Sequence, residues 1–340
     1  MNIAVIGGGA IGSIVAAELT KVGEDVLLVA RPDHARAINN KGLRVIRPDG
    51  SAETIQVRAA ERLDRAYALT IFATKSQDLE SSYQDNNEFL EKTWVLTTQN
   101  GVQGDNLLRT HFEPDDMISS IVMFGATYTK PGEVTYNFTG DWILGRPFST
   151  IDPKTHEVGG ILKKAFPIVV SNNITGMKWL KLFVNFNNCL PALIGKSMQE
   201  TYSDLDFCRI SVQLLREGLK VIKDADIELV SLPNFPVERI LGMAQMPVEQ
   251  AAGILNKTLP GLSKEPLYGS ILQSIMRGKP SEIDFINGEV VLIGGNIGSP
   301  APLNSKVVDM VHQVEISGKY FSKEEVKELL ISEKSSVKSE

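Results

Sequence analysis

The chain has 340 residues, a formal net charge of −6 and 43% hydrophobic residues, which indicates a folded protein large enough for two domains. The negative charge argues against nucleic acid or an anionic membrane surface as a partner. No apolar run of about 18 residues predicts a membrane span, and the chain starts in a strand with no signal peptide before it. The two cysteines lack metal-ligand and redox spacing. We therefore expect a cytoplasmic protein with no membrane or nucleic-acid partner and no metal.

A glycine turn follows the first apolar segment. Residues 3–6 are typical of a buried strand, and a G-x-G-x-x-G spacing leads from them into a segment with helical periodicity. The first glycine would form the tight turn, the second would admit a pyrophosphate at the helix N-terminus, and the third would allow close packing of helix and strand. A nucleotide-free doubly wound domain is the alternative. We predict a dinucleotide site at Gly7, Gly8, Gly9, Ala10, Ile11 and Gly12.

The end of the next strand, residues 25–29, indicates which dinucleotide is bound. An NAD-binding fold places a carboxylate there for the ribose 2′-hydroxyl, whereas an arginine suits a 2′-phosphate. Here Ala30 and Arg31 follow the strand, and the first carboxylate is that of Asp33. The planar guanidinium of Arg31 would bind a phosphate dianion, although it could also be an ordinary surface arginine. We therefore expect NADP(H) as the cofactor.

The rest of the first 172 residues predicts a doubly wound sheet. Residues 41–57 read as a hairpin around Pro48-Asp49-Gly50, inserted after the second strand. Lys75 and Asn100 come directly after two buried strands, at the sheet edge where α/β proteins bind ligands. A helix over 152–166 would have Asp152 as its N-cap and Pro153 as its first residue. Strands are expected at 69–73, 94–98, 118–123, 133–138, 142–144 and 168–170.

Beyond a boundary at residues 171–173 the periodicity becomes helical. The predicted fold class is α/β: a Rossmann-like N-terminal domain (1–172), an all-α domain for substrate binding and dimerisation (173–320), and a charged tail (321–340) whose end we expect to be mobile. The oligomeric state stays open, with a homodimer as the state considered. Helices are expected at 177–193, 205–224, 237–256 with a break near Pro247, 267–277, 281–293 ending at Gly294-Gly295, and 301–319.

The first of these helices carries an unusual polar stripe. Lys178, Lys181, Asn185 and Asn188 are spaced 3, 4 and 3 apart and would share one face. Asparagine is a poor helix former, so the stripe predicts a wet cleft or a buried network rather than a plain solvent face. Lys178 lies nearer the helix end and is expected to reach solvent. Glu282 would stand in the first turn of a later helix, where compensation of the helix dipole is the simpler role.

Together these motifs resemble the ketopantoate reductase (2-dehydropantoate 2-reductase) family, from the glycine turn to about Lys319. The matching residues are Gly7 to Gly12, Ala30-Arg31, Ala73-Thr74-Lys75, Gln99-Asn100-Gly101, Trp179-x-Lys181-x3-Asn185, Ser270 with Leu272-Gln273, and Glu282-Ile283-Asp284 with Asn287-Gly288. The resemblance implies a doubly wound cofactor domain, a helical second domain and a cleft between them.

The resemblance also implies roles for individual residues. Lys181 would be the general acid, with Glu282 as the carboxylate near that lysine and the cofactor. Asn100 would touch both cofactor and substrate, and Lys75 would be a second lysine at the cleft. Groups that hold the keto acid would be Asn185 and Ser270, with Asn188 as the nearest amide where many members have an Asn-Pro pair, here Cys189-Leu190.

We expect NADPH-dependent reduction of 2-dehydropantoate to (R)-pantoate, with hydride added to the ketone carbon and a proton from Lys181. The departures at Cys189 and at Ser274, where Asp is common, fall on the substrate side and leave the substrate open. One alternative is a reductase of the same fold that acts on another small 2-oxo or β-keto acid. Another is a non-catalytic NADP(H)-binding sensor, which would have no use for Lys181, Asn185 and Glu282.

Overall fold

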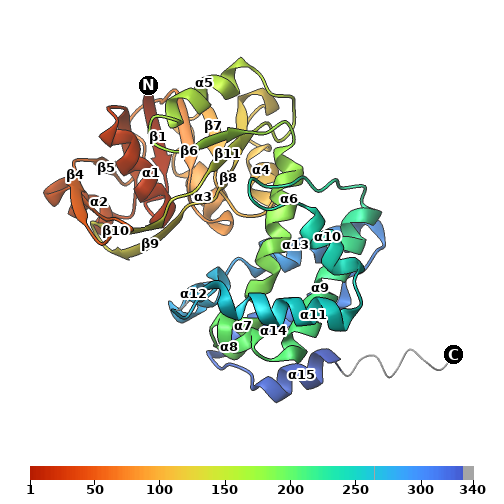
Figure 1. Ribbon diagram of the computed structural model, residues 1–340. Coiled ribbons are helices and arrows are strands. Elements are labelled where there is room, and N and C mark those ends of the chain that lie inside the picture. The colour runs from red at the N-terminus through yellow and green to blue at the C-terminus, as the bar shows by residue number, and fades with distance from the viewer. Residues whose placement is uncertain (264, 332–340) are drawn as a thin grey trace. The chain divides into compact units, whose positions relative to one another are not determined.

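The computed structural model describes residues 1–263 and 265–331, which fold as two compact units (Figure 1). The first unit comprises Met1–Lys178 and the second begins at Trp179. The division falls within one helix, a few residues after the boundary expected from the sequence. The end of the charged tail, which we expected to be mobile, lies outside the described residues.

The first unit is built on an eight-stranded sheet with the order β12-β11-β8-β7-β6-β1-β2-β5. Neighbouring strands are parallel except for β11, which runs antiparallel to β8. Because β1 lies between β2 and β6, the strand order reverses there, and this is the point where open α/β sheets bind ligands. The strands are β1 (Asn2–Ile6), β2 (Asp25–Val29), β5 (Arg58–Ala60), β6 (Leu69–Phe72), β7 (Trp94–Thr97), β8 (Met117–Val122), β11 (Trp142–Gly145) and β12 (Ile168–Val170).

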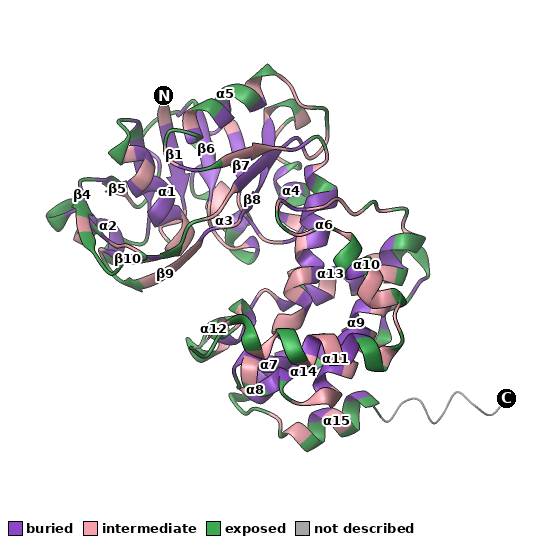
Figure 2. Ribbon diagram, in the orientation of Figure 1, coloured by how far each residue is buried: buried purple, intermediate pink, exposed green. Residues whose placement is uncertain are grey.

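Most of these strands have the buried colour in Figure 2, and alternate residues belong to cores on opposite faces of the sheet. In β1, Ile3 and Val5 belong to the core under α1 (Ala10–Lys21), α2 (Pro32–Lys41) and α5 (Pro153–Leu162). Ala4 and Ile6 belong to the core on the other face, with α3 (Leu79–Gln84) and α4 (Gln103–Leu108). Helices on both faces confirm the predicted doubly wound sheet.

A second sheet of four strands, in the order β4-β3-β10-β9, packs beside α1. The predicted hairpin is confirmed as the antiparallel pair β3 (Leu43–Ile46) and β4 (Ala52–Ile55). The other two strands of this sheet, β9 (Gly125–Lys130) and β10 (Glu133–Phe138), come some 80 residues later in the chain. β10 pairs with β3 in parallel, with Glu133 opposite Arg44, and β9 pairs with β10 in antiparallel orientation. The sequence predicted neither β9 nor this sheet, because the parallel pairing joins segments far apart in the chain.

His34 joins α2 to the second sheet and to α1. Its Nδ1 accepts the N–H of Gly132 at 2.9 Å, in the turn between β9 and β10. Its Nε2 therefore carries the proton and donates to the hydroxyl of Ser13 at 3.1 Å. Burial lowers the pKa of His34, although the nearby carboxylate of Asp33 raises it. The ring is held neutral by its surroundings, and protonation would break the contact with Gly132.

The second unit is helical, as predicted. Two predicted elements are confirmed closely: α9 over Leu205–Asp224, and the break at Pro247 between α10 (Glu238–Gln245) and α11 (Val248–Thr258). In the first unit, the carboxylate of Asp152 likewise caps α5 as predicted, accepting the N–H of Thr155 at 2.9 Å. The other helices are α8 (Met198–Tyr202), α12 (Ser270–Met276), α13 (Asn287–Ile297), α14 (Pro302–Ser317) and α15 (Lys323–Ile331).

The predicted single helix over 177–193 is wrong. It is divided into α6 (Ile174–Asn185), a 3-10 turn over Phe186–Asn188, and α7 (Cys189–Ile194). Pro191 has no N–H to give to the carbonyl of Asn187, four residues earlier. The hydroxyl of Tyr202 donates to that carbonyl instead, at 2.8 Å. The helix therefore changes its winding at the asparagines.

The predicted helix over 281–293 also needs correction. Residues Ile283–Phe285 form a 3-10 turn, and α13 starts only at Asn287, after a residue with φ −117° and ψ −88°. Gly294 does not end the helix: a Cβ there would stand 2.3 Å from the carbonyl oxygen of Ser299, so glycine allows a close crossing of the chain. Gly298, with φ +71°, is the actual end.

Lys178 is buried, with 2% of its surface exposed, and the expectation that it reaches solvent is wrong. Its ammonium donates to Oδ2 of Asp105 in α4 at 2.7 Å. The same carboxylate accepts the hydroxyls of Thr97 at 2.5 Å and Ser119 at 2.7 Å, both fully buried. All four residues belong to the first unit, so the ion pair fastens the start of α6 to β7, β8 and α4.

The start of α6 is buried for a local reason as well. Ile174 is fully buried against Gly145 at the end of β11, where a Cβ would stand 2.6 Å from that of Ile174. Oδ1 of Asn173 accepts the N–H of Gly176 at 2.8 Å and so caps the helix. A lysine near the beginning of a helix reaches solvent only where that end of the helix is exposed, and here it is covered.

Lys178→Ala should lower the free energy of unfolding by about 3–5 kcal/mol, because it leaves the Asp105 carboxylate buried without its cation. The double variant Lys178→Met, Asp105→Asn removes both charges and should lose much less. Urea unfolding of the two variants and of the wild type measures the difference. Equal losses in the single and double variants would contradict a buried ion pair.

His34 should make the first unit sensitive to mild acid. The unfolded chain binds a proton at His34 near pH 6.5, whereas the folded chain binds it only at lower pH. Its contribution to stability is therefore complete above about pH 6.5 and is lost as the pH falls through the folded pKa. We expect urea unfolding to show this loss in the wild type and in His156→Ala, which removes an exposed histidine. His34→Gln should reduce it; an unchanged pH dependence in that variant would contradict the assignment.

Candidate functional site

The predicted site residues belong to both units. Gly7 to Gly12, Arg31, Lys75 and Asn100 lie in the first unit, and the second contains Lys181, Asn185, Asn188, Ser270 and Glu282. In the first unit, the glycine turn follows β1, Lys75 follows β6 and Asn100 follows β7, so neighbouring parallel strands bring these segments to one edge of the sheet.

The glycine turn requires that Gly7 and Gly12 carry no side chain. Gly7 has φ +117°, and a Cβ there would stand 2.6 Å from the backbone nitrogen of Thr74 after β6. At Gly12 a Cβ would stand 2.0 Å from the carbonyl oxygen of Gly7, so α1 crosses directly over the turn. Gly9, the N-cap of α1, has no atom within 4 Å of its ideal Cβ, and no side chain caps the helix. The backbone at Gly9 is thus open to a ligand at the helix N-terminus.

Gln99 fixes the two loops at this edge of the sheet. Its buried amide donates to the carbonyls of Phe72 at 2.9 Å and Thr74 at 2.8 Å, so the loop after β7 holds the loop after β6. Lys75 and Asn100, both half-buried, lie next to these anchored residues in sequence. The sequence identified Gln99 only as part of a motif. Its hydrogen bonds show that it connects the loop after β7 to the loop after β6.

Two hydroxyls beside Lys75, those of Thr74 and Ser76, are buried and find no hydrogen-bond partner among the described residues. Buried polar groups are normally hydrogen-bonded, so unpaired ones at a ligand edge indicate donors kept for a ligand. With the open N-terminus of α1 and the cation of Lys75, they fit the phosphates of a dinucleotide.

Arg31 is exposed and stands at the start of α2, directly after Ala30 at the end of β2. The ring of Tyr128, from β9 of the second sheet, packs edge-on against that of His34, with centroids 5.0 Å apart. Burial raises the pKa of Tyr128, and the carboxylate of Asp33 raises it further, while Arg31 lowers it. Both charges therefore act at Tyr128, a residue that no motif of the sequence singled out because β9 comes near α2 only through the second sheet.

In the second unit, the polar and apolar sides of α6 are as predicted. Leu182 and Phe183 are buried, whereas Lys181 and Asn185 are half-buried on the other side. One helical turn separates Lys181 from Asn185, which places them on the same face. Lys178, the first residue of the predicted stripe, forms an ion pair with Asp105 instead.

The 3-10 turn after α6 brings Asn188 against the start of α12. Gly269, the N-cap of α12, has φ −64° and ψ 160°, a conformation open to any residue. A Cβ on it would nevertheless stand 2.5 Å from Oδ1 and 3.0 Å from Cβ of Asn188. Asn188 thus packs directly beside Ser270, and two residues predicted to hold one substrate are neighbours although 82 positions separate them in sequence.

Glu282 is half-buried at the start of the 3-10 turn Ile283–Phe285 rather than in the first turn of a long helix, so the predicted compensation of an α-helix dipole does not apply. The hydroxyl of Ser281 accepts the N–H of Ile283 at 3.2 Å, which closes the backbone around Glu282. Such local turns hold a side chain in place without a helix.

Cys189 stands where many members of the family that the sequence resembles have an asparagine. It is fully buried. Its thiol donates to the carbonyl of Phe186 at 3.0 Å, and burial raises its pKa to about 12. Cys208 is buried too, with a pKa raised by burial to about 11. Both cysteines are therefore unreactive packing residues, and Cys189 is not a substrate ligand.

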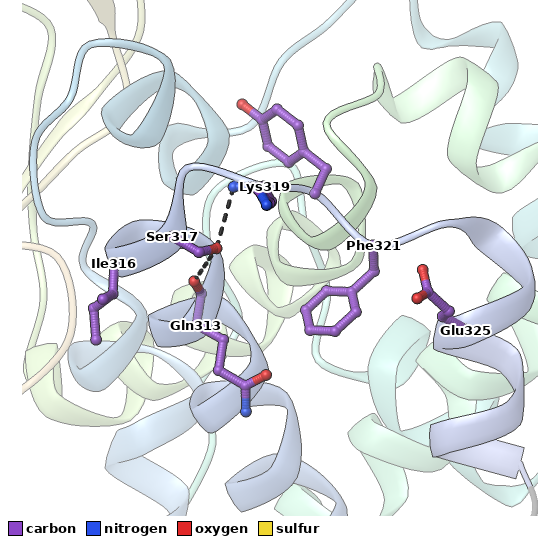
Figure 3. A pocket seen from close by; sticks show the side chains of 7 residues that line it. Gln313, Ile316, Ser317, Lys319, Phe321 and Glu325 are labelled. Carbon is purple, nitrogen blue, oxygen red and sulfur yellow. Dashed lines mark hydrogen bonds between the residues drawn. The ribbon is translucent and has the colours of Figure 1, made fainter.

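A surface hollow of about 500 Å³ lies at the end of α14, in the second unit (Figure 3). Ser317 holds its rim, donating to the carbonyl of Gln313 at 2.6 Å and accepting the N–H of Lys319 at 3.2 Å. Its lining includes none of the predicted site residues: it consists of Gln313, Ile316, Ser317, Lys319, Tyr320, Phe321 and Glu325.

Within residues 1–263 and 265–331, no group of three or more His, Cys, Asp and Glu side chains could hold a metal ion. None of the helices in that part of the chain is both long and apolar enough to cross a membrane.

Comparison with known proteins identifies the family. The family described as Ketopantoate reductase PanE/ApbA matches residues 3–147, and its C-terminal counterpart matches residues 173–315. The 2-dehydropantoate 2-reductase of Pyrococcus horikoshii is 30% identical over 323 residues, which cover 94% of this chain and 99% of the relative.

Solved structures agree with this match. A PanE/ApbA family ketopantoate reductase from Ralstonia eutropha JMP134 is 26% identical, with a TM-score of 0.79 over 93% of this chain and 99% of its own. A D-mandelate dehydrogenase solved with NADH and anilino(oxo)acetate is 23% identical, with a TM-score of 0.78 over 93% of this chain and 99% of its own. At that identity the second likeness concerns the fold alone. The chain belongs to the ketopantoate reductase family of oxidoreductases, as its motifs predicted.

Proposed function

We propose that the protein is an NADPH-dependent reductase of a small 2-oxo acid, with reduction of 2-dehydropantoate to (R)-pantoate as the leading reaction. The observation that carries this proposal is the polar wall of the second unit. Lys181 and Asn185 share one face of α6, and the next turn packs Asn188 against Gly269, beside Ser270. A protein that only binds a nucleotide would have no use for this wall.

The first unit would bind the cofactor. The N-terminus of α1 at Gly9, with the hydroxyls of Thr74 and Ser76, supports binding of the pyrophosphate. Arg31 would bind the 2′-phosphate through its planar guanidinium, and Lys75 and Asn100 would face the nicotinamide end. The D-mandelate dehydrogenase with a similar fold was solved with NADH, so the preference between the two cofactors is open to measurement.

The chemistry would be general acid catalysis. Bound NADPH would supply the hydride that reaches the ketone carbon. Lys181 would donate a proton to the ketone oxygen as negative charge develops there, because an uncompensated alkoxide in a water-poor site is costly. Glu282 would keep Lys181 cationic against the desolvation that lowers a lysine pKa. Asn185, Asn188 and Ser270 would hold the carboxylate and hydroxyls of the substrate.

A reductase that acts on another 2-oxo or β-keto acid is the second candidate. It is favoured by the buried Cys189, which supplies no polar ligand where many family members have an asparagine. Steady-state NADPH oxidation with 2-dehydropantoate beside a panel of 2-oxo acids tests both. The highest kcat/KM identifies the substrate. If no keto acid is turned over, the proposal of a reductase is wrong and the non-catalytic NADP(H)-binding sensor is the remaining alternative.

The proposed function also suggests a cellular compartment and an oligomeric state. We propose a cytoplasmic enzyme, which two buried free thiols support, because disulfides are rare in a reducing compartment. A homodimer through the second unit is supported by exposed apolar side chains on its helices, among them Met276, Leu292 and Ile316.

Lys181→Ala should lower kcat by about 10²–10⁴-fold while NADPH still binds, as expected for loss of a general acid. Lys196→Ala removes an exposed lysine of the same unit, which pairs with Glu200 at 3.6 Å, and should leave kcat unchanged. Stopped-flow reduction and NADPH fluorescence titration separate the two effects. A normal kcat in Lys181→Ala would mean that the catalytic register on α6 is wrong.

Arg31→Ala should raise KM for NADPH about 10–100-fold and leave KM for NADH nearly unchanged, because a charge-assisted contact is worth about 1.5–3 kcal/mol. Arg36→Ala, an exposed arginine of the same helix, is the matched control. Initial rates with both cofactors give the ratio. A wild type that already prefers NADH would refute the assignment of Arg31.

A further inference from the structure

Two residues of α14 contact the residues on both sides of Glu282, one through a backbone N–H and one through a side chain. Oε1 of Glu315 accepts the N–H of Ser281 at 2.7 Å, immediately before Glu282. Nε2 of His312 lies 2.9 Å from Oδ1 of Asp284, two residues after it. Nδ1 of the same ring lies 3.1 Å from Oε2 of Glu315, so the two α14 residues also contact each other. We call Ser281, Asp284, His312 and Glu315 the α14 bracket.

The bracket is complete only when His312 is cationic. Each ring nitrogen faces a carboxylate oxygen, and carboxylates only accept, so both nitrogens must carry protons. Burial lowers the pKa of His312, but hydrogen bonds and charge from Asp284 and Glu315 outweigh it and raise the pKa above its ordinary value. A neutral ring would turn a lone pair toward one of the two carboxylates and lose that contact.

The elements packed against α14 carry further charged or titratable groups. Besides the 3-10 turn with Asp284, α14 packs against α7, α9 and α13. The carboxylate of Glu217 in α9 accepts the N–H groups of Leu303 and Asn304 at the start of α14, about two turns before His312. Cys189 in α7 keeps its proton, and α13 contributes the buried Glu289.

We propose that His312 and Glu315 are positioning residues for Glu282, and that the bracket holds the Glu282 carboxylate where it can act on Lys181. The proposal rests on the function proposed above. Neither α14 residue need touch substrate or cofactor; both act through the backbone at Ser281 and the side chain of Asp284. The reaction should then depend on a histidine that takes no part in it.

The pH profile of kcat should therefore have an alkaline limb, that is, a range in which kcat falls as the pH rises. Because the folded pKa of His312 is raised, the bracket is complete below about pH 6.5 and is lost as the pH rises through the folded value. Loss of the bracket would lower kcat more than it changes KM, since Glu282 is proposed to act on the proton donor at the chemical step.

The test is a pH series of kcat and KM with NADPH and 2-dehydropantoate, or the best substrate of the panel. His312→Ala should lower kcat at pH 7 by about tenfold, since misplacement by about 1 Å costs up to about 10²-fold. It should leave NADPH affinity within twofold and remove the limb that His312 causes. His312→Lys keeps a cation and should restore most of kcat, with the limb moved toward the lysine pKa. His156→Ala, an exposed histidine of the first unit, should behave as the wild type.

Two further variants separate this proposal from the proposed function. If Glu282→Gln leaves kcat unchanged, the role of Glu282 fails and the bracket with it. If Glu282→Gln lowers kcat while His312→Ala keeps the wild-type kcat and pH profile, only the bracket is overturned. Should His312→Ala not fold, Glu315→Gln takes its place: it removes one charge from His312 and should shift the limb to lower pH, and an unmoved limb overturns the proposal.

Discussion

The missing side chain at Gly12 is the constraint on which the first unit depends. With the ideal Cβ only 2.0 Å from the carbonyl oxygen of Gly7, any other residue would push α1 off the end of β1. That crossing leaves the helix N-terminus open at Gly9 and lets Gly7 pack on the backbone after β6. Because β1 stands where the strand order reverses, one close contact sets the turn, the helix and the ligand edge together.

A missing hydrogen-bond donor has a comparable effect in the second unit. Pro191 leaves the carbonyl of Asn187 without a helical partner, and Tyr202 supplies the replacement donor. The hydroxyl of Ser211 binds the side-chain oxygen of Asn187 at 2.6 Å, so the middle asparagine is structural. Its neighbour Asn188 is then free of the α-helical pattern and lies against Gly269. The adjacent residues Asn187 and Asn188 therefore have different roles.

Buried and half-buried charges divide into two kinds. The Lys178–Asp105 pair is sealed from solvent and satisfied by two further hydroxyls, so it stabilises a single position for the start of α6. The contacts of His312 lie nearer the surface, where solvent and salt weaken them, and they require a proton that is lost within an ordinary pH range. The Lys178–Asp105 pair therefore suits a permanent structural role. The contacts of His312 suit a role in which their strength varies with pH and salt concentration.

The sequence by itself determined the family, the doubly wound class, the helical second unit, the glycine turn and the cap at Asp152. Each of these depends on contacts among residues close in the chain, so periodicity, glycine spacing and capping residues reveal them. The tertiary structure alone decided the second sheet, the burial of Lys178, the neighbours Asn188 and Ser270, and the α14 bracket. In each case the partners are tens of residues apart, from the 28 positions between Asp284 and His312 to the 89 between Arg44 and Glu133. Periodicity is blind to such partners, because it records which face of an element is apolar and not what that face meets.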